Sequence, residues 1–432
     1  MKILHIAPHF GGGTKTVLLN WIQNDTNHEH IFVSLGYADD DVVKICYENR
    51  VVLYSDFHNR DYSVIFDQIE YNDIVIIHYW NFPLLMDFLI NNILPPCRVI
   101  TWCHMAGLYA PYTIPEKIIE YSDKFIFTSP ISYNSNTIKN NLIPTSKLDC
   151  IWSTGGTKYK DVIKKEHEGF NILYVGTLDL SKLREDFIII CREIINKIPE
   201  AKITICGDGA DKSFLQTQVN CFNLQDNIRF EGLVSDLTPY FEVTDIFLYP
   251  LQEKNFSTCE QVLGESQCVG IPAIVFNNPN EKEIISQGMN GFIVDNIEQC
   301  INGVIGLYKD IEYRNKLGEN AKQLAVKKYS TSKMIDDWNR VFNEIIQLPK
   351  KEREWNTDFL TMYGIGTINF IESLDENTAN LFHEYISSKR RLNKLFESNP
   401  QWYSKSKGSI YQYLEYFPDD IWLDEFKKIM EE

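Results

Sequence analysis

The sequence predicts an α/β protein with two doubly wound, Rossmann-like parallel sheets and a C-terminal helical extension. Short apolar segments alternate with helical or loop segments over residues 1–151, and the same alternation resumes at residue 170. The polar stretch 153–169 between them is expected to be a linker. We therefore expect domains at 1–155 and 156–345, and an extension over 346–432.

Seven apolar segments predict the strands of the first sheet, at residues 2–6, 31–35, 51–54, 74–78, 99–103, 124–128 and 148–151. Three glycines at 11–13 separate the first strand from a helix expected to start near residue 16. Glycines in such a loop let backbone amides approach an anion at the helix N-terminus. The run does not fit G-x-G-x-x-G, and no acidic residue follows the second strand, which disfavours a nicotinamide oxidoreductase.

The second sheet is expected from strands at 170–175, 202–207, 228–231, 246–249, 272–276 and 291–294. Helical patterns between them predict helices at 186–198, 257–268 and 297–309. From residue 332 the chain is expected to be helical, and no strand is expected beyond residue 350. The extension has helical spacing at 377–394 and 410–416, and three roles stay open for it: covering an apolar face, homodimerisation, or shaping an acceptor site.

The chain has 432 residues and a net charge of −17, from 42 basic and 59 acidic residues. This charge disfavours nucleic acid and anionic lipid as partners, and the basic run at 389–391 is expected on a solvated helix face. Ten cysteines without C-x-x-C spacing indicate reduced thiols. No apolar run is long enough for a membrane span or a signal peptide. We expect a cytoplasmic protein, with peripheral membrane contact left open and no metal site.

Several residues have the chemistry to bind a phosphate group or the hydroxyl groups of a sugar. Lys182 lies six residues beyond Gly176, after a strand, where a lysine can neutralise a leaving diphosphate. Arg184 could add a bidentate phosphate contact. In a helix over 257–268, Glu260 and Glu265 would lie about 140° apart, and either could hydrogen-bond the hydroxyls of a sugar or ribose.

The order and spacing of these residues resemble retaining glycosyltransferases of the family 4 type, in a variant subgroup with T-x-E-Q-x-L-x-E. The resemblance covers residues 1–345 and is strongest over 170–295. This sequence contains counterparts of the family's second-domain motifs, in the same order. The motif V-G-R-L corresponds to Val175-Gly176-Thr177-Leu178, the family's lysine to Lys182, and G-D-G to Gly207-Asp208-Gly209. The motif F-x-G corresponds to Phe230-Glu231-Gly232, the second glutamate of E-x7-E to Glu265, and G-x-P-V-V to Gly270-Ile271-Pro272-Ala273-Ile274-Val275.

The resemblance implies the GT-B fold, in which two Rossmann-like domains face a cleft. It also implies metal-independent, retaining transfer of a hexose from a nucleotide sugar to a saccharide, lipid-linked or protein acceptor, without a cofactor. The pathway implied is biosynthesis of a surface polysaccharide or glycoconjugate. The base, the sugar and the acceptor do not follow from the sequence.

The resemblance also assigns roles to individual residues. Glu265 would contact the ribose and Lys182 the diphosphate, and Gly12 and Gly13 would lie near the diphosphate and acceptor. His104 would face the donor sugar. The remaining donor-binding candidates are Gly176, Thr177, Arg184, Gly207 and Glu283, with Glu281 competing for the position of Glu283.

Two departures from the family pattern leave an alternative open. Ser257 stands where the family has its first glutamate, and Glu260 is expected to substitute for it. Thr177 replaces the arginine of V-G-R-L, which leaves the phosphate charge to Lys182 and Arg184. The alternatives are a non-catalytic subunit that binds a nucleotide sugar or glycan, and, more remotely, a sugar-nucleotide epimerase.

Overall fold

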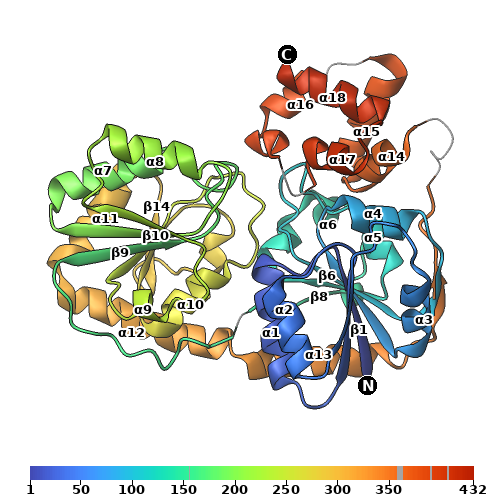
Figure 1. Cartoon of the computed structure of the whole chain (residues 1–432), viewed down its shortest axis with the longest axis horizontal. Helices are drawn as coiled ribbons and strands as arrows, with labels where there is room; N and C mark the ends of the chain where they lie inside the picture. Colours follow the sequence, from blue (N-terminus) through green and yellow to red (C-terminus); the bar gives the residue numbers. More distant parts are fainter. Residues whose placement is uncertain (155, 358–362, 390–391, 406–407) are drawn as a thin grey trace. The chain divides into compact units, whose positions relative to one another are not determined.

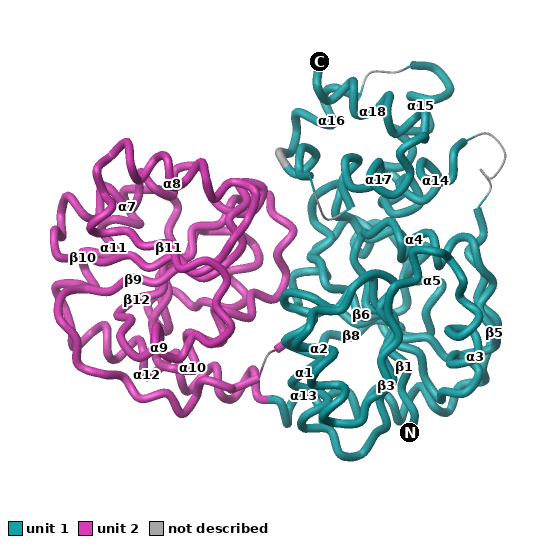
Figure 2. The backbone as a smooth tube through the Cα atoms, viewed as in Figure 1, with its two compact units in different colours: residues 1–153, 331–432 teal, residues 154–330 magenta. Residues whose placement is uncertain are grey.

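The structure is a computed structural model that describes residues 1–154, 156–357, 363–389, 392–405 and 408–432, divided into two compact units (Figure 2). The first unit comprises Met1–Ser153 and Thr331–Glu432, and the second Thr154–Ser330. These limits differ from the expected domains, because residues 331–345 join the first unit instead of the second. The expected limit at residue 155 falls outside the described residues.

The first unit contains a seven-stranded parallel sheet in the order β3-β2-β1-β4-β6-β7-β8 (Figure 1). This order reverses direction beside β1, as in a Rossmann fold. The strands are β1 (Lys2–Ala7), β2 (Glu29–Ser34), β3 (Val52–Ser55), β4 (Ile74–Tyr79), β6 (Val99–Cys103), β7 (Lys124–Phe127) and β8 (Leu148–Cys150). The helices between them are α1 (Gly12–Asn24), α2 (Asp40–Glu48), α3 (Ser63–Tyr71), α4 (Pro83–Ile90), α5 (Glu116–Tyr121) and α6 (Asn136–Asn140).

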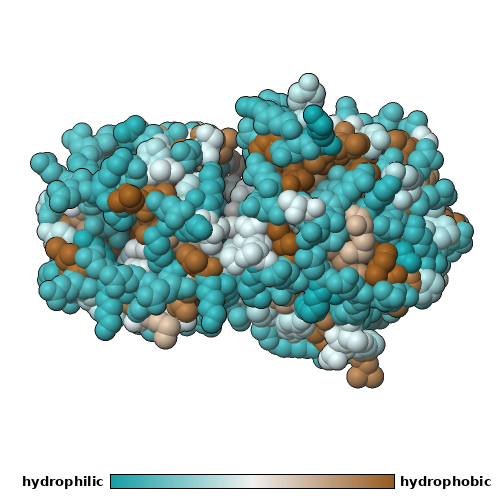
Figure 3. Space-filling model, turned by 90° about the horizontal axis from the view of Figure 1, so that it is seen from below, coloured by the Kyte–Doolittle hydropathy of each residue, from teal (hydrophilic) through white to brown (hydrophobic). Residues whose placement is uncertain are grey.

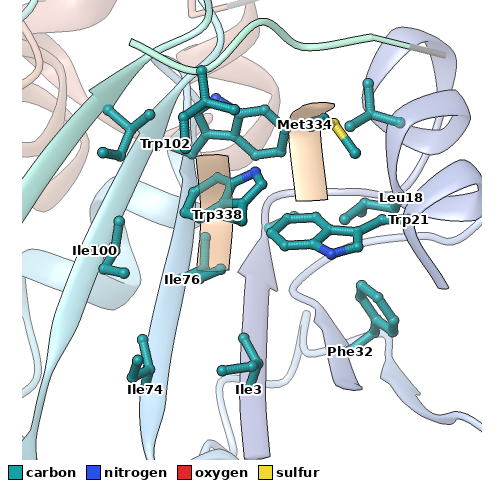
Figure 4. Close-up of a cluster of buried hydrophobic side chains, with 14 of the residues drawn as sticks. Ile3, Leu18, Trp21, Phe32, Ile74, Ile76, Ile100, Trp102, Met334 and Trp338 are labelled. Carbon is teal, nitrogen blue, oxygen red and sulfur yellow. The ribbon is translucent and has the colours of Figure 1, made fainter. Parts of the chain in front are cut away.

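The strands of the first sheet are apolar because helices cover both of its faces. Every residue of β4 and β6 is buried, as expected for central parallel strands. On one face, α1 and the returning helix α13 (Thr331–Ile345) complete the core. There Trp21, Trp102 and Trp338 pack together, and the Trp21 and Trp338 rings lie 4.8 Å apart (Figure 4). Residues from the two ends of the chain therefore form one core.

The second unit contains a six-stranded parallel sheet in the order β11-β10-β9-β12-β13-β14. Its strands are β9 (Phe170–Val175), β10 (Ala201–Cys206), β11 (Ile228–Gly232), β12 (Ile246–Tyr249), β13 (Ala273–Phe276) and β14 (Gly291–Val294). Its helices are α7 (Phe187–Lys197), α8 (Lys212–Cys221), α9 (Thr238–Phe241), α10 (Gln261–Val269), α11 (Ile297–Lys309) and α12 (Ile311–Lys328). Both expected Rossmann-like sheets are thus confirmed.

The C-terminal extension covers the apolar helix α4, in which every residue is buried. Its helices are α14 (Ile365–Glu372), α15 (Glu376–Ser388), α16 (Asn393–Glu397), α17 (Ile410–Tyr416) and α18 (Ile421–Glu431). Asn369 of α14 donates a hydrogen bond to Asp87 of α4 at 3.2 Å, and the Tyr413 hydroxyl donates to Asn81 at 2.8 Å. Covering an apolar face is therefore one role of the extension, and homodimerisation through it stays a prediction.

Three expected elements are corrected. A strand follows residue 350 after all: β15 (Lys351–Arg353) pairs antiparallel with β5 (Leu94–Cys97), outside the main sheet. The helix expected at 257–268 begins only at Gln261, because Glu260 has a non-helical backbone. The pattern at 377–394 falls on two helices, because Lys389 ends α15 in the left-handed conformation with φ 56° and α16 begins only at Asn393. Arg390 and Arg391 lie outside the described residues.

The surface that Figure 3 shows is mostly polar, as the charged composition of the sequence leads one to expect. On the face shown in Figure 3, hydrophilic side chains predominate and hydrophobic ones form separate patches. All ten cysteines lie in described residues and none forms a disulfide. None of the helices in the described parts of the chain combines the length and hydrophobicity that crossing a membrane requires.

Replacing Trp338 tests whether α13 is part of the first core. Because its ring is fully buried among other aromatic rings, Trp338→Ala should lower the free energy of unfolding by about 3–5 kcal/mol. The exposed Lys333 on the same helix is the control, and Lys333→Ala should change it by less than about 0.5 kcal/mol. Urea unfolding followed by circular dichroism measures both. Equal stability of the two variants would contradict this assignment.

Candidate active site

The candidate residues of the second unit gather at one edge of its sheet. Gly176 and Gly207 follow β9 and β10, Tyr249 is the last residue of β12, and Glu281 lies in the turn after β13. In a parallel sheet all strands end at the same edge, and ligands bind there in open α/β sheets. Residues that are far apart in the sequence therefore meet at this edge.

The two glycines allow the loops after β9 and β10 to pack backbone against backbone. Gly207 has φ +151°, and a Cβ atom there would lie 1.9 Å from the carbonyl oxygen of Gly176. A Cβ atom on Gly176 would lie 2.8 Å from the Tyr174 hydroxyl. The Gly176 amide donates to the Cys206 carbonyl at 3.0 Å. Close packing thus requires glycine at both positions, and the neighbouring Thr177 is exposed.

Lys182 and Glu260 form an ion pair at this edge. The Lys182 Nζ lies 3.0 Å from Glu260 Oε2, and the two side chains are only 13% and 9% exposed. The Tyr249 hydroxyl donates a hydrogen bond to the same carboxylate oxygen. Lys182 also lies 5.7 Å from the centre of the Phe256 ring. A desolvated lysine is thus held in place by a carboxylate and two aromatic rings.

Glu260 stays charged although it is buried. Burial opposes ionisation, but the charge of Lys182 and the hydrogen bond from Tyr249 outweigh it and lower the pKa of the carboxyl group. Glu260 is the N-cap residue of α10, so its position relative to Glu265 is not the helical one expected from the sequence. The structure brings Glu260 and Lys182 together, whereas the sequence had suggested only that each could contact the donor.

Glu281 is close to this pair, whereas Glu283 faces elsewhere. Burial and then repulsion from Glu260 raise the pKa of Glu281 to about 8. Its Oε1 accepts a hydrogen bond from Asn278, but its Oε2 is buried without a partner among the described residues. The same is true of the side-chain amide of the neighbouring Asn280. Glu283 is half-buried near Tyr329. Of the two competing glutamates, the structure places Glu281 near Lys182.

Glu265 and Arg184 are two further ionisable candidates of the second unit. Glu265, in α10, is half-buried, and burial raises its pKa to about 7. Arg184 donates two hydrogen bonds to Asp186, at 2.9 and 2.6 Å, and stacks 4.2 Å from the centre of the Phe276 ring. Each cation is thus paired with a carboxylate, but Lys182 is the more buried of the two, with 13% of its side chain exposed against 26% for Arg184, and this makes it the stronger candidate for a desolvated phosphate contact.

The candidates of the first unit lie at the corresponding edge of its own sheet. Gly12 and Gly13 are exposed at the start of α1, directly after β1, and Gly12 has φ +57°. His104 follows β6 and is half-buried. Its Nε2 lies 3.0 Å from Nδ1 of His78, and burial lowers its pKa to about 3. The ring is therefore a neutral imidazole that can donate one hydrogen bond and accept one.

One group among the described residues is close enough to share a metal ion. The possible ligand atoms of Asp25, His28 and His30 lie within 4.8 Å of one another. Asp25 Oδ2 lies 2.8 Å from His28 Nδ1 and 3.2 Å from His30 Nε2, so hydrogen bonds account for the grouping. These residues lie near the start of β2, at the edge of the sheet opposite to His104.

Sequence reasoning missed Tyr249 and ranked Glu281 below Glu283. A signal for Tyr249 was present, because it is the last residue of a strand whose end faces the site. Spacing alone cannot choose between Glu281 and Glu283, since the short turn in which they lie decides which side chain enters the core.

Comparison with known proteins finds a family model that matches the second unit. Residues 157–324 match the family model "Glycosyl transferases group 1". A poly(glycerol-phosphate) alpha-glucosyltransferase of Bacillus subtilis is 26% identical over 164 residues, 37% of this chain and 24% of that protein. An uncharacterized glycosyltransferase of Haemophilus influenzae is 22% identical over 54% of this chain and 63% of its own. The chain spans less than two thirds of the length of these curated relatives.

Solved structures show the fold of about four fifths of the chain. Anabaena HepE, solved in complex with UDP, matches with a TM-score of 0.63 at 11% identity, over 80% of this chain and 100% of HepE. TarM of S. aureus, solved in a complex that includes UDP, matches with a TM-score of 0.65 at 11% identity, over 79% of this chain and 100% of TarM. The fold is therefore GT-B, as the resemblance implied.

Glu281→Gln tests the buried carboxyl group beside the ion pair. Because its pKa is raised, the Glu281 carboxyl group binds a proton more tightly in the folded protein than in the unfolded chain, where a glutamate titrates near about 4.3. The proton therefore stabilises the fold at low pH, and that stabilisation is lost as the pH rises from about 4.3 to about 8. Since glutamine loses no proton, the variant should gain stability relative to the parent between pH 5 and pH 8. Urea midpoints at both pH values measure this, and a constant difference would contradict it.

Proposed function

We propose that this chain is a retaining glycosyltransferase that moves a sugar from a nucleotide-sugar donor to a hydroxyl group of an acceptor without a metal ion. The observation that carries the proposal is the buried Lys182–Glu260–Tyr249 cluster at the ligand-binding edge of a unit that matches the glycosyl transferases group 1 model. A fixed cation at this edge suits a diphosphate leaving group.

Lys182 is the proposed catalytic cation. As the bond between sugar and phosphate breaks, negative charge grows on the leaving diphosphate, and a preorganised lysine stabilises it more than a mobile one. Glu260 holds the ammonium group in place before the donor binds. When the donor is present, Glu260 is proposed to accept hydrogen bonds from the transferred sugar, which is the role expected of the family's first glutamate.

The remaining candidates are proposed to position the donor and acceptor. Glu265 binds the ribose hydroxyls through its carboxylate. Within the part of the chain that the structure describes, buried polar atoms of Glu281 and Asn280 have no hydrogen-bond partner, which supports a ligand contact there. Gly12, Gly13 and His104, on the first unit, are proposed to act on the diphosphate, acceptor and sugar. Glu283 and Arg184 are kept as donor-binding candidates from the resemblance.

The donor and acceptor classes are proposed from the relatives. HepE and TarM were solved with UDP, which supports a UDP-sugar donor. Similar proteins include a poly(glycerol-phosphate) glucosyltransferase and a galactosyltransferase of the lipopolysaccharide outer core, which supports an acceptor in a surface polymer or glycoconjugate. We propose action at the cytoplasmic side, in peripheral contact with a membrane where the acceptor is lipid-linked.

A second candidate function rests on the two departures from the family pattern. With Ser257 in place of the first glutamate and Thr177 in place of the arginine, the chain could bind a nucleotide sugar or glycan without turning it over. Turnover by the purified chain alone excludes this alternative. Isomerisation of the donor without an acceptor would indicate an epimerase.

The first test is binding of UDP-, GDP-, ADP-, dTDP- and CMP-sugars, measured by thermal shift and calorimetry. We expect one nucleotide, UDP, to bind and to bind equally in the presence of a chelator. Glu265→Ala should weaken this binding about tenfold or more, because it removes a hydrogen-bond partner of the ribose hydroxyls. Binding that a chelator abolishes would contradict the metal-free site, and binding of no nucleotide would contradict the donor site.

Lys182→Met tests the catalytic cation. It should lower kcat by about a hundredfold or more, because the developing charge loses its stabilising partner. The matched control is Lys202→Met: Lys202 is an exposed lysine of the same unit, and β10 places it at the opposite edge of the sheet. Its kcat should equal that of the parent. Similar activity of the two variants would show that the cation lies elsewhere.

A further inference from the structure

A continuous chain of histidines crosses the core of the first unit. His5 of β1 contacts His30 of β2 on one side, with 2.9 Å between Nε2 and Nδ1. On the other side it contacts His78 of β4, with 3.0 Å between Nδ1 and Nε2. His78 in turn contacts His104, so each inner ring uses both of its nitrogens.

The row of hydrogen-bonded histidines begins at a buried carboxylate, that of Asp25. Asp25 Oδ2 lies 3.2 Å from His30 Nε2, and it also accepts a hydrogen bond from the Trp21 indole at 3.2 Å. The Asn27 amide donates to Oδ1 at 2.9 Å. Burial opposes ionisation of Asp25, but the hydrogen bonds from His28, His30 and the Asn27 amide outweigh it and lower the pKa of the carboxyl group. Asp25 is therefore an ionised group that only accepts hydrogen bonds.

The rings of the chain are uncharged because their surroundings are apolar. His5 and His78 are fully buried, and His5 stacks on Phe32 with 4.6 Å between ring centres. Trp102 packs against both His78 and His104. Burial lowers the pKa values of His5, His30 and His78.

These facts fix the direction of every hydrogen bond in the chain. A neutral imidazole carries one proton, so a ring that donates with one nitrogen accepts with the other. Since Asp25 only accepts, His30 donates to it from Nε2 and accepts at Nδ1. In the same way, His5 and His78 each donate from Nε2 to the preceding ring and accept at Nδ1 from the following one. At the far end, His104 donates from Nε2 and keeps Nδ1 unprotonated.

We propose that Asp25, acting through His30, His5 and His78, fixes the tautomer of His104 so that its Nδ1 accepts a hydrogen bond from a hydroxyl group of the sugar substrate. This inference rests on the proposed function for the contact between His104 and the sugar, but not for the tautomer itself. Asp25 and the three inner histidines are positioning residues, since each acts on His104 through its neighbour.

Two variants of the central ring separate this role from a structural one. His5→Phe keeps a flat ring against Phe32 but interrupts the chain. His5→Gln keeps one donor and one acceptor, so an amide can continue the hydrogen bonds in the same direction. Both variants alter the same buried position, and glutamine loses the ring that packs against Phe32, whereas phenylalanine keeps one. A loss seen only in His5→Phe therefore reports the hydrogen bonds and not the packing.

The direct measurement is the tautomer of His104 in the full chain. Long-range ¹H–¹⁵N NMR of protein labelled with ¹⁵N-histidine distinguishes the two tautomers, and His104→Gln assigns the signal. We expect the proton on Nε2 in the parent and in His5→Gln, and a mixture of tautomers in His5→Phe and in Asp25→Leu. A proton on Nδ1 of His104 in the parent would overturn the proposal, as would an unchanged tautomer in His5→Phe.

Turnover tests the contact with the sugar. We expect kcat/KM to fall about tenfold to a hundredfold in His5→Phe and to stay within about threefold of the parent in His5→Gln. If the tautomer changes in His5→Phe but kcat/KM does not, the hydroxyl contact is wrong. If the parent turns over no donor, the proposed function fails, while the NMR result still decides the tautomer.

Discussion

Parallel pairing of the strands is the constraint on which the rest of this structure depends. In the main sheet of each unit it points every strand toward one edge, so the residues that end the strands and the loops that follow them meet there. Lys182, Tyr249 and Glu281 are separated by long stretches of sequence, yet they follow neighbouring strands and share one small region. The same constraint in the first unit puts Gly12 and His104 at one edge of its sheet.

Two buried polar clusters, one in each unit, are stabilised in different ways. In the second unit a cation and an anion compensate each other, and the Tyr249 hydroxyl supplements the pair; neither side chain would tolerate burial alone. In the first unit, the single negative charge of Asp25 is stabilised by donors only, and neutral rings extend its influence across the sheet. The first arrangement keeps the charge of Lys182 in place for a ligand, and the second fixes which nitrogen of each histidine ring carries the proton.

Much of the fold followed from the sequence, because buried parallel strands are apolar on both faces and are easily recognised. The antiparallel pair β5–β15 did not follow, since β5 contains two prolines and β15 is charged and short. Lys182 and Glu260 were found as separate candidates, but their ion pair depends on the backbone of Glu260 leaving the helical conformation before α10. The histidine chain was hidden for a similar reason: only the register of β1, β2 and β4 brings those rings side by side.

The return of the chain to the first unit has a consequence for its synthesis. Trp21 and Trp102 emerge from the ribosome early, but α13, which carries Trp338, follows only after the whole second unit. At about 5–20 residues per second, this delay is on the order of ten seconds or more. Throughout that time a large aromatic surface of the nascent chain lacks its cover, and it is the natural place for a chaperone to bind.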